Sequence, residues 1–231
     1  MIGIIGAMQV EVESLKEIMK SVKIEKVSGV DFYIGDLCGI QAVVAVSGVG
    51  KVNAAVCAEA MILKYAPEYI INIGVAGGLA EGIKVGDVVI AESVVEHDMD
   101  TSPIGDPVGL ISGINLINIP CSAGLIDGLF KSASAVDGIS AVKGVIASGD
   151  QFISSDKQRI FIKDTFKASA AEMEGASIGH VCYLNNVDFC VLRAISDCAD
   201  GESPMSFAEF TQFAVKNSIK IILDFLENTN K

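Results

Sequence analysis

Short apolar runs along this chain alternate with amphipathic or alanine-rich stretches. Residues 2–5 are all apolar or glycine and are followed by Gly6, a pattern typical of a buried strand that ends in a turn. Beyond it, Val12, Leu15 and Met19 recur at helical spacing and predict a helix over residues 11–19. The same criteria predict helices over residues 52–64, 125–134 and 174–184, and strands over residues 32–34, 41–46, 69–73, 87–91, 142–147 and 189–194.

Strands and helices alternate along the whole chain, which is the order of an α/β protein. Residues 32–34 and 41–46 are expected to form a hairpin, whereas helices separate most of the other strands, as in parallel sheets. No linker, low-complexity tract or convincing repeat interrupts the pattern. The sequence therefore predicts one domain over residues 1–231, a three-layer α/β/α sandwich around a mixed, largely parallel twisted sheet.

Two sequences of the capping-box type predict helix starts. Ser155 is followed by Gln158, and Ser206 is followed by Glu209, ahead of a helix expected to run nearly to the end of the chain. Between the predicted strands, residues 98–120 are rich in Gly, Pro, Asn and Ser. We expect this stretch to be irregular. Irregular stretches of this length in a compact domain usually have a functional role or form an interface.

Composition and charge narrow the class of protein. The formal net charge is −12 and the only arginines are Arg159 and Arg193, which argues against nucleic acids and polyphosphates as ligands. No unbroken apolar run is long enough for a membrane span. A signal peptide has a basic segment before its apolar run, and no such segment precedes the first apolar run here. The six cysteines contain no C-x-x-C pair and several lie in apolar runs, so we expect reduced thiols and a cytoplasmic protein.

Two glycine-rich loops follow predicted strands. The loop from Ser47 to Lys51 is similar to a phosphate-binding loop, but Ala45 and Val52 occupy positions that such a loop gives to Gly and to Ser or Thr. The loop from Gly74 to Gly78 does not match the dinucleotide-binding fingerprint. Glycines in such loops often serve only close chain packing, yet two of them after apolar strands favour a ligand crevice at the strand C-termini.

Three acids stand at the ends of apolar segments, where an ionised carboxylate is costly unless it is paired or hydrogen-bonded: Glu11, Glu174 and Asp197. Taken alone, Asp197 is explained by a helix cap or a turn and Glu11 by a solvated helix start. Glu174, flanked by Ala and Gly residues, is harder to explain structurally, whereas Glu13 and Glu172 are expected to be structural or surface acids. Together the three predict a pocket for acid–base chemistry on an uncharged, hydrogen-bonding substrate.

Six motifs occur in one order along nearly the whole chain: Gly6-Ala7-Met8-x-x-Glu11, Ser47-Gly48-Val49-Gly50-Lys51, Asn72-Ile73-Gly74-Val75-Ala76-Gly77-Gly78, Ser148-Gly149-Asp150-x-Phe152-Ile153, Glu172-Met173-Glu174 and Arg193-Ala194-Ile195-Ser196-Asp197. Each alone is weak, because purine nucleoside phosphorylases share some of the glycine loops. The ordered set resembles the 5′-methylthioadenosine/S-adenosylhomocysteine nucleosidases. The resemblance implies hydrolysis that releases adenine, as in methionine salvage, without a metal or organic cofactor.

The resemblance also implies roles for residues at the matching positions. Asp197 would protonate adenine N7, Glu11 would activate water, and Glu174 would hold the ribose hydroxyls beside Met173. For adenine, the resemblance implies that Phe152 stacks on the base and that the Ile153 backbone binds its edge. Ala76 and Gly77 would line the pocket, and the 5′-thio group would be surrounded by Met8, Val49 and Phe207. Arg193 and Ser196 would orient the acids and the water.

The physical chemistry of the reaction fits these roles. Departure of the base places negative charge on the purine and positive charge on the sugar, so a protonated acid is needed at one end and carboxylates at the other. Simpler interpretations exist for single residues: Phe152 is more often core, and Arg193 could serve a structural ion pair. Val75 departs from the Ser or Thr of many relatives and cannot donate a hydroxyl hydrogen bond to water or ribose.

Several alternatives stay open at the level of sequence. A purine nucleoside phosphorylase would need cations for phosphate, which the low arginine count disfavours. A nucleoside-binding sensor, or hydrolysis of futalosine or inosine, would use the same pocket. The run His97-Asp98-Met99-Asp100 could bind a metal but lacks a second histidine nearby, so a loop or interface role is favoured. The resemblance further implies a homodimer in which residues 98–120 of one subunit close the 5′-group pocket of its partner.

Overall fold

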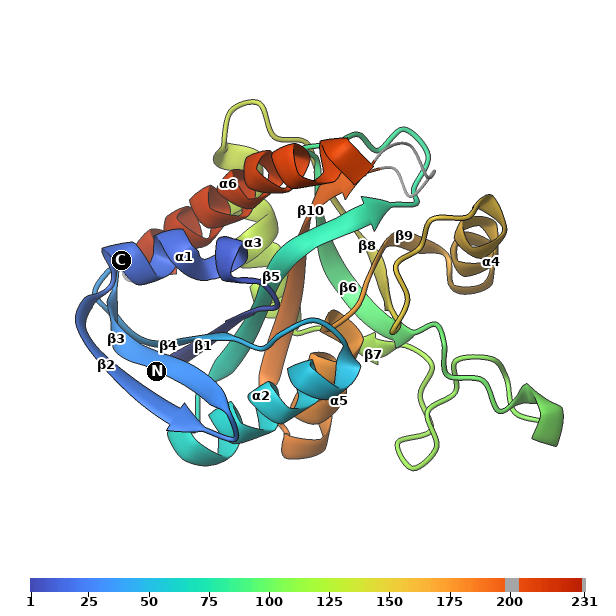
Figure 1. Ribbon diagram of the computed structural model, residues 1–231, viewed down its shortest axis with the longest axis horizontal. Helices are drawn as coiled ribbons and strands as arrows, with labels where there is room; N and C mark the ends of the chain where they lie inside the picture. Colours follow the sequence, from blue (N-terminus) through green and yellow to red (C-terminus); the bar gives the residue numbers. More distant parts are fainter. Residues whose placement is uncertain (198–203, 230–231) are drawn as a thin grey trace.

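A mixed β-sheet runs through the middle of the molecule between two groups of helices (Figure 1). The structure, a computed structural model, describes residues 1–197 and 204–229, with the side chains of residues 204–210 left out. Its strands are β1 (Ile2–Gly6), β2 (Lys20–Val27), β3 (Val30–Leu37), β4 (Ile40–Val46), β5 (Tyr69–Gly78), β6 (Val88–Glu96), β7 (Ile119–Pro120), β8 (Ala141–Ser148), β9 (Ala168–Glu172) and β10 (Asp188–Asp197).

The sheet closes on itself at one end. β5 pairs with β10, β10 with β6, β6 with β8, β8 with β9, and β9 returns to pair with β5. From this ring, β1, β4, β3 and β2 extend outward from β5 in that order. Among the described strands, parallel and antiparallel pairings are equally frequent, and β1, β4, β5 and β10 are mutually parallel. The expected mixed α/β architecture is confirmed, and closure into a ring is an addition that the strand pattern did not predict.

The helices cover both faces of the sheet (Figure 1). α1 and α3 pack with α6 on one side, while α2 and α5 pack against each other on the other side and α4 lies beside β9. Their bounds are α1 (Gln9–Ile18), α2 (Lys51–Tyr65), α3 (Ala123–Ala135), α4 (Asp156–Phe166), α5 (Gly175–Asn185) and α6 (Pro204–Thr229). None of the described helices combines the length and apolar character that crossing a membrane requires.

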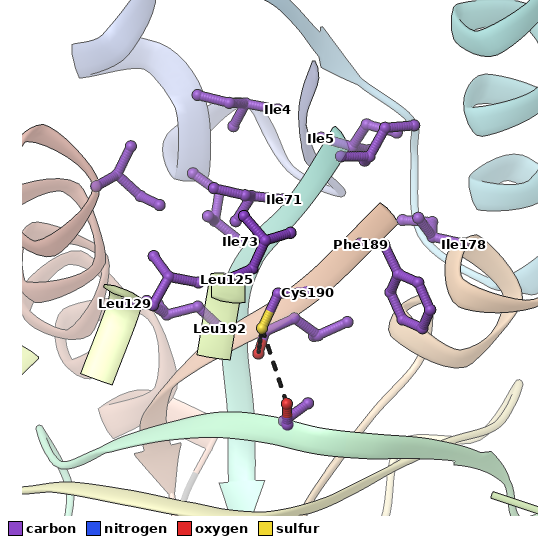
Figure 2. Close-up of a cluster of buried hydrophobic side chains, with 14 of the residues drawn as sticks. Ile4, Ile5, Ile71, Ile73, Leu125, Leu129, Ile178, Phe189, Cys190 and Leu192 are labelled. Atoms are coloured by element: carbon purple, nitrogen blue, oxygen red, sulfur yellow. Dashed lines mark hydrogen bonds between the residues drawn. The ribbon is translucent and has the colours of Figure 1, made fainter. Parts of the chain in front are cut away.

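The core consists of aliphatic side chains from the inner strands and the helix faces that cover them (Figure 2). Ile71 and Ile73 of β5 and Leu192 of β10 are completely buried, with Leu129 of α3 on one side of the sheet and Ile178 of α5 on the other. Strands buried on both faces lose the strict alternation of apolar and polar residues. This explains why they appear in the sequence as continuous runs of Ile, Val and Leu.

Most expected elements are present, usually longer than predicted, but β2, β9 and the two-residue β7 were missed. β2 is an exposed edge strand with three Lys and one Glu, and such charge on an edge disfavours pairing with other molecules while it obscures the strand pattern. β9 has the sequence ASAAE, and alanine has low strand propensity. β2 and β9 are therefore set by tertiary pairing rather than by their own composition.

The two predicted helix starts had different outcomes. Ser155 caps α4, its Oγ accepting from the backbone N–H of Gln158 at 3.3 Å. The second prediction was wrong, because α6 already begins at Pro204 and Ser206 lies inside it. Pro tolerates the first turn of a helix, since its missing N–H has no partner there in any case.

Residues 98–120 are irregular, as expected. They contain one turn of 3-10 helix, η1 (Ser102–Ile104), an isolated bridge between Ile111 and Leu116, and the two-residue strand β7. The part that carries η1 extends away from the body of the molecule (Figure 1), and Ile104 at its end is 83% exposed.

Candidate active site

A cavity of about 230 Å³ opens at the carboxyl ends of β1, β5 and β10, beside β9 and the loop after β8. All three acids predicted from sequence line it, together with every other predicted contact except Arg193 and Phe207. The lining residues are Ala7, Met8, Glu11, Val49, Val75, Ala76, Gly77, Gln151, Phe152, Ile153, Ala171, Glu172, Met173, Glu174, Ser196 and Asp197. Arg193 lies behind the cavity wall, and Phe207 is among the residues whose side chains the structure does not describe.

Glu11 folds back over the start of α1. Its Oε2 accepts from the backbone N–H groups of Ala7 at 2.7 Å and Met8 at 2.8 Å, and its Oε1 accepts from Val75 at 3.1 Å. Burial raises the pKa of the Glu11 carboxyl above its ordinary value, against the lowering effects of the Arg193 charge and the three N–H groups. Glu11 is thus a buried, oriented carboxylate of increased basicity at the cavity wall.

Gly74 makes room for this carboxylate. A Cβ at Gly74 would lie 2.6 Å from Glu11 Oε1 and 3.1 Å from Arg193 Nη1. Any side chain at this position of β5 would therefore displace Glu11, Arg193 or the strand itself. The segment 74–78, expected to be a loop, is the end of β5, and its first glycine makes room for the side chains of Glu11 and Arg193.

Glu174 stands between two helices. It is the residue before α5, and its Oε1 accepts from the backbone N–H of Gly50 at 2.8 Å, at the start of α2. Gly50 has φ +97°, a conformation that favours glycine and aims this N–H at the carboxylate. Burial first, and then the charge of Glu172, raises the pKa of Glu174 to about 7, while Arg193 and the Gly50 N–H act in the opposite direction.

Arg193 and Glu172 form a buried ion pair beneath the cavity. Arg193 binds Glu172 through Nε and Nη2 and donates from Nη2 to Asn72 Oδ1 at 2.6 Å. Glu172 also accepts from Ser148 Oγ and from the N–H of Gly175 at 2.8 Å, at the start of α5. Although burial opposes it, the Arg193 charge and these hydrogen bonds hold the pKa of Glu172 below its ordinary value.

This pair refines the sequence interpretation of both residues. Glu172 is structural, as expected, but it is buried and also reaches the cavity wall, so a surface role is excluded. A buried ion pair is weak evidence for stability in itself, but its geometry is well defined. We infer that its effect on the site is electrostatic, through Glu11 and Glu174.

Asp197 ends β10 at a β-bulge. Ile195 pairs with Ala76 and Asp197 pairs with Gly77, so Ser196 is the extra residue. Bulges change the direction of side chains and are frequent beside active sites. The buried Ser196 donates from Oγ to Asp197 Oδ2 at 2.9 Å. Asp197 itself is only partly buried, unlike the two glutamates.

The other walls of the cavity are apolar. Phe152 is 60% exposed at the cavity, which excludes the interpretation of this residue as core. Ile153 beside it is buried in a small apolar cluster with Leu79 and Phe166. Met8, Val49 and Met173 complete the apolar surface. The cavity thus combines four carboxylates, those of Glu11, Glu172, Glu174 and Asp197, with an aromatic ring and an apolar wall.

Cations are missing from the described cavity lining. No Lys, Arg or His is among the described residues that line it, and Arg159 instead pairs with Asp156 on the surface. The part of the chain that the structure describes also holds no cluster of three or more His, Cys, Asp or Glu suited to a metal ion. Asp98 binds Lys51 and Asp150, in place of the metal considered from sequence.

The fold and the carboxylate-lined cavity define a class of protein. The sequence model of the phosphorylase superfamily matches residues 1–227. The 5′-methylthioadenosine/S-adenosylhomocysteine nucleosidase of Geobacillus kaustophilus is 38% identical over 225 residues, covering 97% of this chain and 95% of the relative. The chain therefore belongs to the 5′-methylthioadenosine/S-adenosylhomocysteine nucleosidase family of the phosphorylase superfamily.

Solved structures agree with this family. The 5′-methylthioadenosine/S-adenosylhomocysteine nucleosidase of Neisseria meningitidis, in complex with methylthio-immucillin-A, has a TM-score of 0.94 and 36% identity, covering 98% of both chains. The futalosine hydrolase of Helicobacter pylori has a TM-score of 0.93 and 36% identity, covering 98% of this chain and 97% of that one. The structural likeness therefore extends to hydrolases that differ in the nucleoside they are named for.

Sequence reasoning overlooked some residues at the site. Glu172 could have been suspected, because it has the same alanine-rich surroundings as Glu174. Gln151 and Ala171 gave no signal of their own and line the cavity because their neighbours in sequence do. Only the pairing of β9 with β5 and β8 shows that Ala171 reaches the site.

Proposed function

We propose that this protein is an N-glycosyl hydrolase that cleaves 5′-methylthioadenosine and S-adenosylhomocysteine, releasing adenine and the 5-thioribose product. The observation that carries the proposal is that Glu11, Glu174 and Asp197 line one cavity together with Phe152 and Met8. Such a cavity offers an aromatic surface to the base, carboxylates to the sugar and an apolar wall to a thioether.

We assign the general acid to Asp197 and the general base to Glu11. Asp197 donates a proton to N7 as the bond between base and ribose breaks, and the Ser196 hydroxyl fixes its carboxyl by the bond to Oδ2. Glu11 takes a proton from water, which attacks the anomeric carbon. Its backbone hydrogen bonds orient it, and burial makes it a stronger base than an exposed glutamate.

We assign the ribose hydroxyls to Glu174 and the base to Phe152 and Ile153. A carboxylate held by the Gly50 N–H retains an oxygen for the sugar, and its negative charge stabilises an oxocarbenium-like transition state. Phe152 stacks on adenine, the Ile153 backbone reads its edge, and Ala76 and Gly77 line the floor. Met8 and Val49 enclose the 5′-thio group and Met173 assists Glu174 at the ribose, while Phe207, the third residue proposed for the 5′-thio group, lies outside the described side chains.

Phosphorolysis is the runner-up reaction. It requires cations to hold phosphate, and the described cavity lining contains none. Arg193 does not supply this charge, because it is buried and bound to Glu172 and Asn72. Requirement of phosphate for cleavage, with ribose 1-phosphate as the product, would reject hydrolysis.

A nucleoside sensor and a different nucleoside substrate are the remaining alternatives. Asp197→Asn abolishes turnover if Asp197 is the acid, whereas a sensor binds nucleosides without releasing a base in either form. Side-by-side assays of base release from methylthioadenosine, S-adenosylhomocysteine, adenosine and futalosine decide the substrate. Preference for futalosine would keep the hydrolase and correct its specificity.

A homodimer in the cytoplasm completes the proposal. Exposed apolar side chains lie on the neighbouring helices α2 and α5, among them Val52, Leu63 and Leu184. Together with Ile104 on the extended segment 98–120, they support a dimer in which that segment closes the partner's pocket. Cys57, Cys121, Cys182 and Cys190 are free thiols, in keeping with a reducing compartment. Light scattering tests the dimer, and full activity in EDTA tests the absence of a metal requirement.

A further inference from the structure

Lys51 connects three segments of the chain beside the cavity. Its Nζ donates to Asp98 Oδ1 at 2.6 Å, after the end of β6. Its backbone N–H, in the first turn of α2, donates to Asp150 Oδ1 at 2.8 Å. Asp150, in the loop after β8, donates its own N–H to Asp98 Oδ2 at 2.9 Å. These three residues, here called the lysine cluster, form a closed set of hydrogen bonds.

The cluster adjoins two walls of the cavity. Gly50, the residue before Lys51, donates its N–H to Glu174, so consecutive N–H groups at the start of α2 bind Glu174 and Asp150. Asp150 is followed directly by Gln151, Phe152 and Ile153, which line the cavity. Residues 149–153 are therefore tied to the same helix end that holds the proposed ribose carboxylate.

The segment before Asp98 also supports this loop. A Cβ at Gly149 would lie 2.4 Å from His97 Nε2, so the buried His97 ring packs directly against the loop backbone. Lys51 and Asp98 are each about 20% exposed at the side chain, so solvent screens their interaction less than on an open surface. Although burial opposes it, the bonds to Asp98 and Glu96 raise the pKa of Lys51 and keep it charged.

We propose that Lys51, Asp98 and Asp150 are positioning residues, which hold the 149–153 loop and the Gly50 N–H in place before substrate enters. None of them lines the cavity, so they act through Phe152 and Glu174. The kinetic consequence rests on the proposed function, whereas the ordering of the two segments does not.

Loss of the cluster is expected to raise KM more than it lowers kcat. When the binding-competent arrangement is only partly populated, apparent affinity falls by that fraction, while substrate that does bind restores the arrangement. Hydrogen bonds to charged groups contribute enough that we expect a rise in KM of about ten-fold or more.

The test compares Lys51→Met with Lys143→Met in the full-length protein. Lys143 forms an equally short pair with Asp127, 2.6 Å, at a site that does not adjoin the cavity. Lys51→Met leaves the carboxylates of Asp98 and Glu96 without the lysine that binds them. The double variant K51M/D98N is therefore measured as well, because it removes the unpaired charge of Asp98. KM and kcat are determined for methylthioadenosine, and amide hydrogen exchange is followed in residues 47–52 and 149–153.

We expect K51M and K51M/D98N to have a higher KM and faster amide exchange in residues 47–52 and 149–153. K143M should change neither quantity. Lys51→Arg should retain most of the wild-type affinity. A fall in kcat alone, or unchanged exchange in both segments, contradicts the positioning role. Dissociation of a wild-type dimer in K51M would assign the defect to assembly and also overturn the proposal. Absence of nucleosidase activity in the wild type would reject the proposed function, while hydrogen exchange still decides the positioning role.

Discussion

Nη2 of Arg193 lies 3.8 Å from Oε2 of Glu174, while the same guanidinium binds Glu172 directly through both Nε and Nη2. The arginine therefore favours one of two neighbouring glutamates. The arginine charge helps to lower the pKa of Glu172 despite its burial, whereas burial first, and then repulsion by Glu172, raises the pKa of Glu174 to about 7. Burial and this ion pair together give two neighbouring glutamates pKa values that are shifted in opposite directions.

The titration of Glu174 predicts a pH dependence of stability. Glu174 retains its proton up to about pH 7 in the folded protein, but its ordinary pKa of 4.5 applies in the unfolded chain. Between these values the folded state binds more protons, so its stability falls as pH rises and stays lower above pH 7. Glu174→Gln removes this pH-dependent loss. The free energy of unfolding of the variant minus that of wild type should therefore increase by at most about 3 kcal/mol from pH 4 to pH 8.

Denaturant unfolding at several pH values measures this difference. Glu13→Gln is the control for the substitution itself, because Glu13 is an exposed acid on α1 and does not line the cavity. A pH-independent difference for Glu174→Gln would show that Glu174 titrates normally in the folded protein.

Replacement of Glu11 by Gln should separate binding from catalysis. Gln keeps the size of the side chain but cannot take a proton from water, so we expect kcat to fall by about 10²–10⁴-fold. Adenine does not need the water, and its affinity by calorimetry should change little. Glu13→Gln again serves as the control, with kcat unchanged, and kcat of E11Q near that of wild type would remove Glu11 from the mechanism.

Gly74→Ala should impair the site through a single methyl group. Its Cβ would lie 2.6 Å from Glu11 Oε1, which forces the carboxylate or β5 to move. We expect kcat to fall at least about ten-fold, because small misplacements of catalytic groups have large effects on rate. At Gly124 in α3 a Cβ meets nothing within 4 Å, so Gly124→Ala should be tolerated. Equal activities of the two variants would show that Glu11 needs no such space.

Phe152→Ala should weaken adenine binding without destabilising the fold. The ring is 60% exposed, so its removal leaves no core cavity, whereas stacking of a base on an aromatic ring contributes about 1–3 kcal/mol. We expect a loss of about ten-fold or more in adenine affinity and little change in Tm. Phe161→Ala on α4 controls for removal of a part-exposed aromatic ring. Unchanged affinity in F152A would place adenine elsewhere.

The fold was predictable where burial shapes the sequence directly. β1, β5 and β10 are continuous apolar runs because both faces of the sheet are covered, and α1 shows its buried face as Val12 and Leu15. β2 was missed because its charged residues obscure the strand pattern, and β9 was missed because alanine has low strand propensity. Ring closure through β5 and β9 depends on contacts between distant residues, which local pattern does not encode.

The sequence predicted which residues line the site better than it predicted how their charges are paired. The positions of Glu11, Glu174 and Asp197 at strand or helix ends already suggested a shared crevice, and they line one cavity. The sequence did not indicate that Gly50 would hold Glu174, or that Arg193 would pair with Glu172. Such pairings depend on where β10 and α2 lie relative to α5, which only the folded chain determines.

The most direct test follows the oxygen of water into the sugar product. Methylthioadenosine is incubated with the protein in phosphate-free buffer made with H₂¹⁸O, and the products are analysed by mass spectrometry. Hydrolysis with Glu11 as base predicts free adenine and 5-methylthioribose that carries one ¹⁸O at the anomeric position, after correction for exchange of free sugar with solvent. Release of adenine only after phosphate is added, or no release under either condition, would contradict the account.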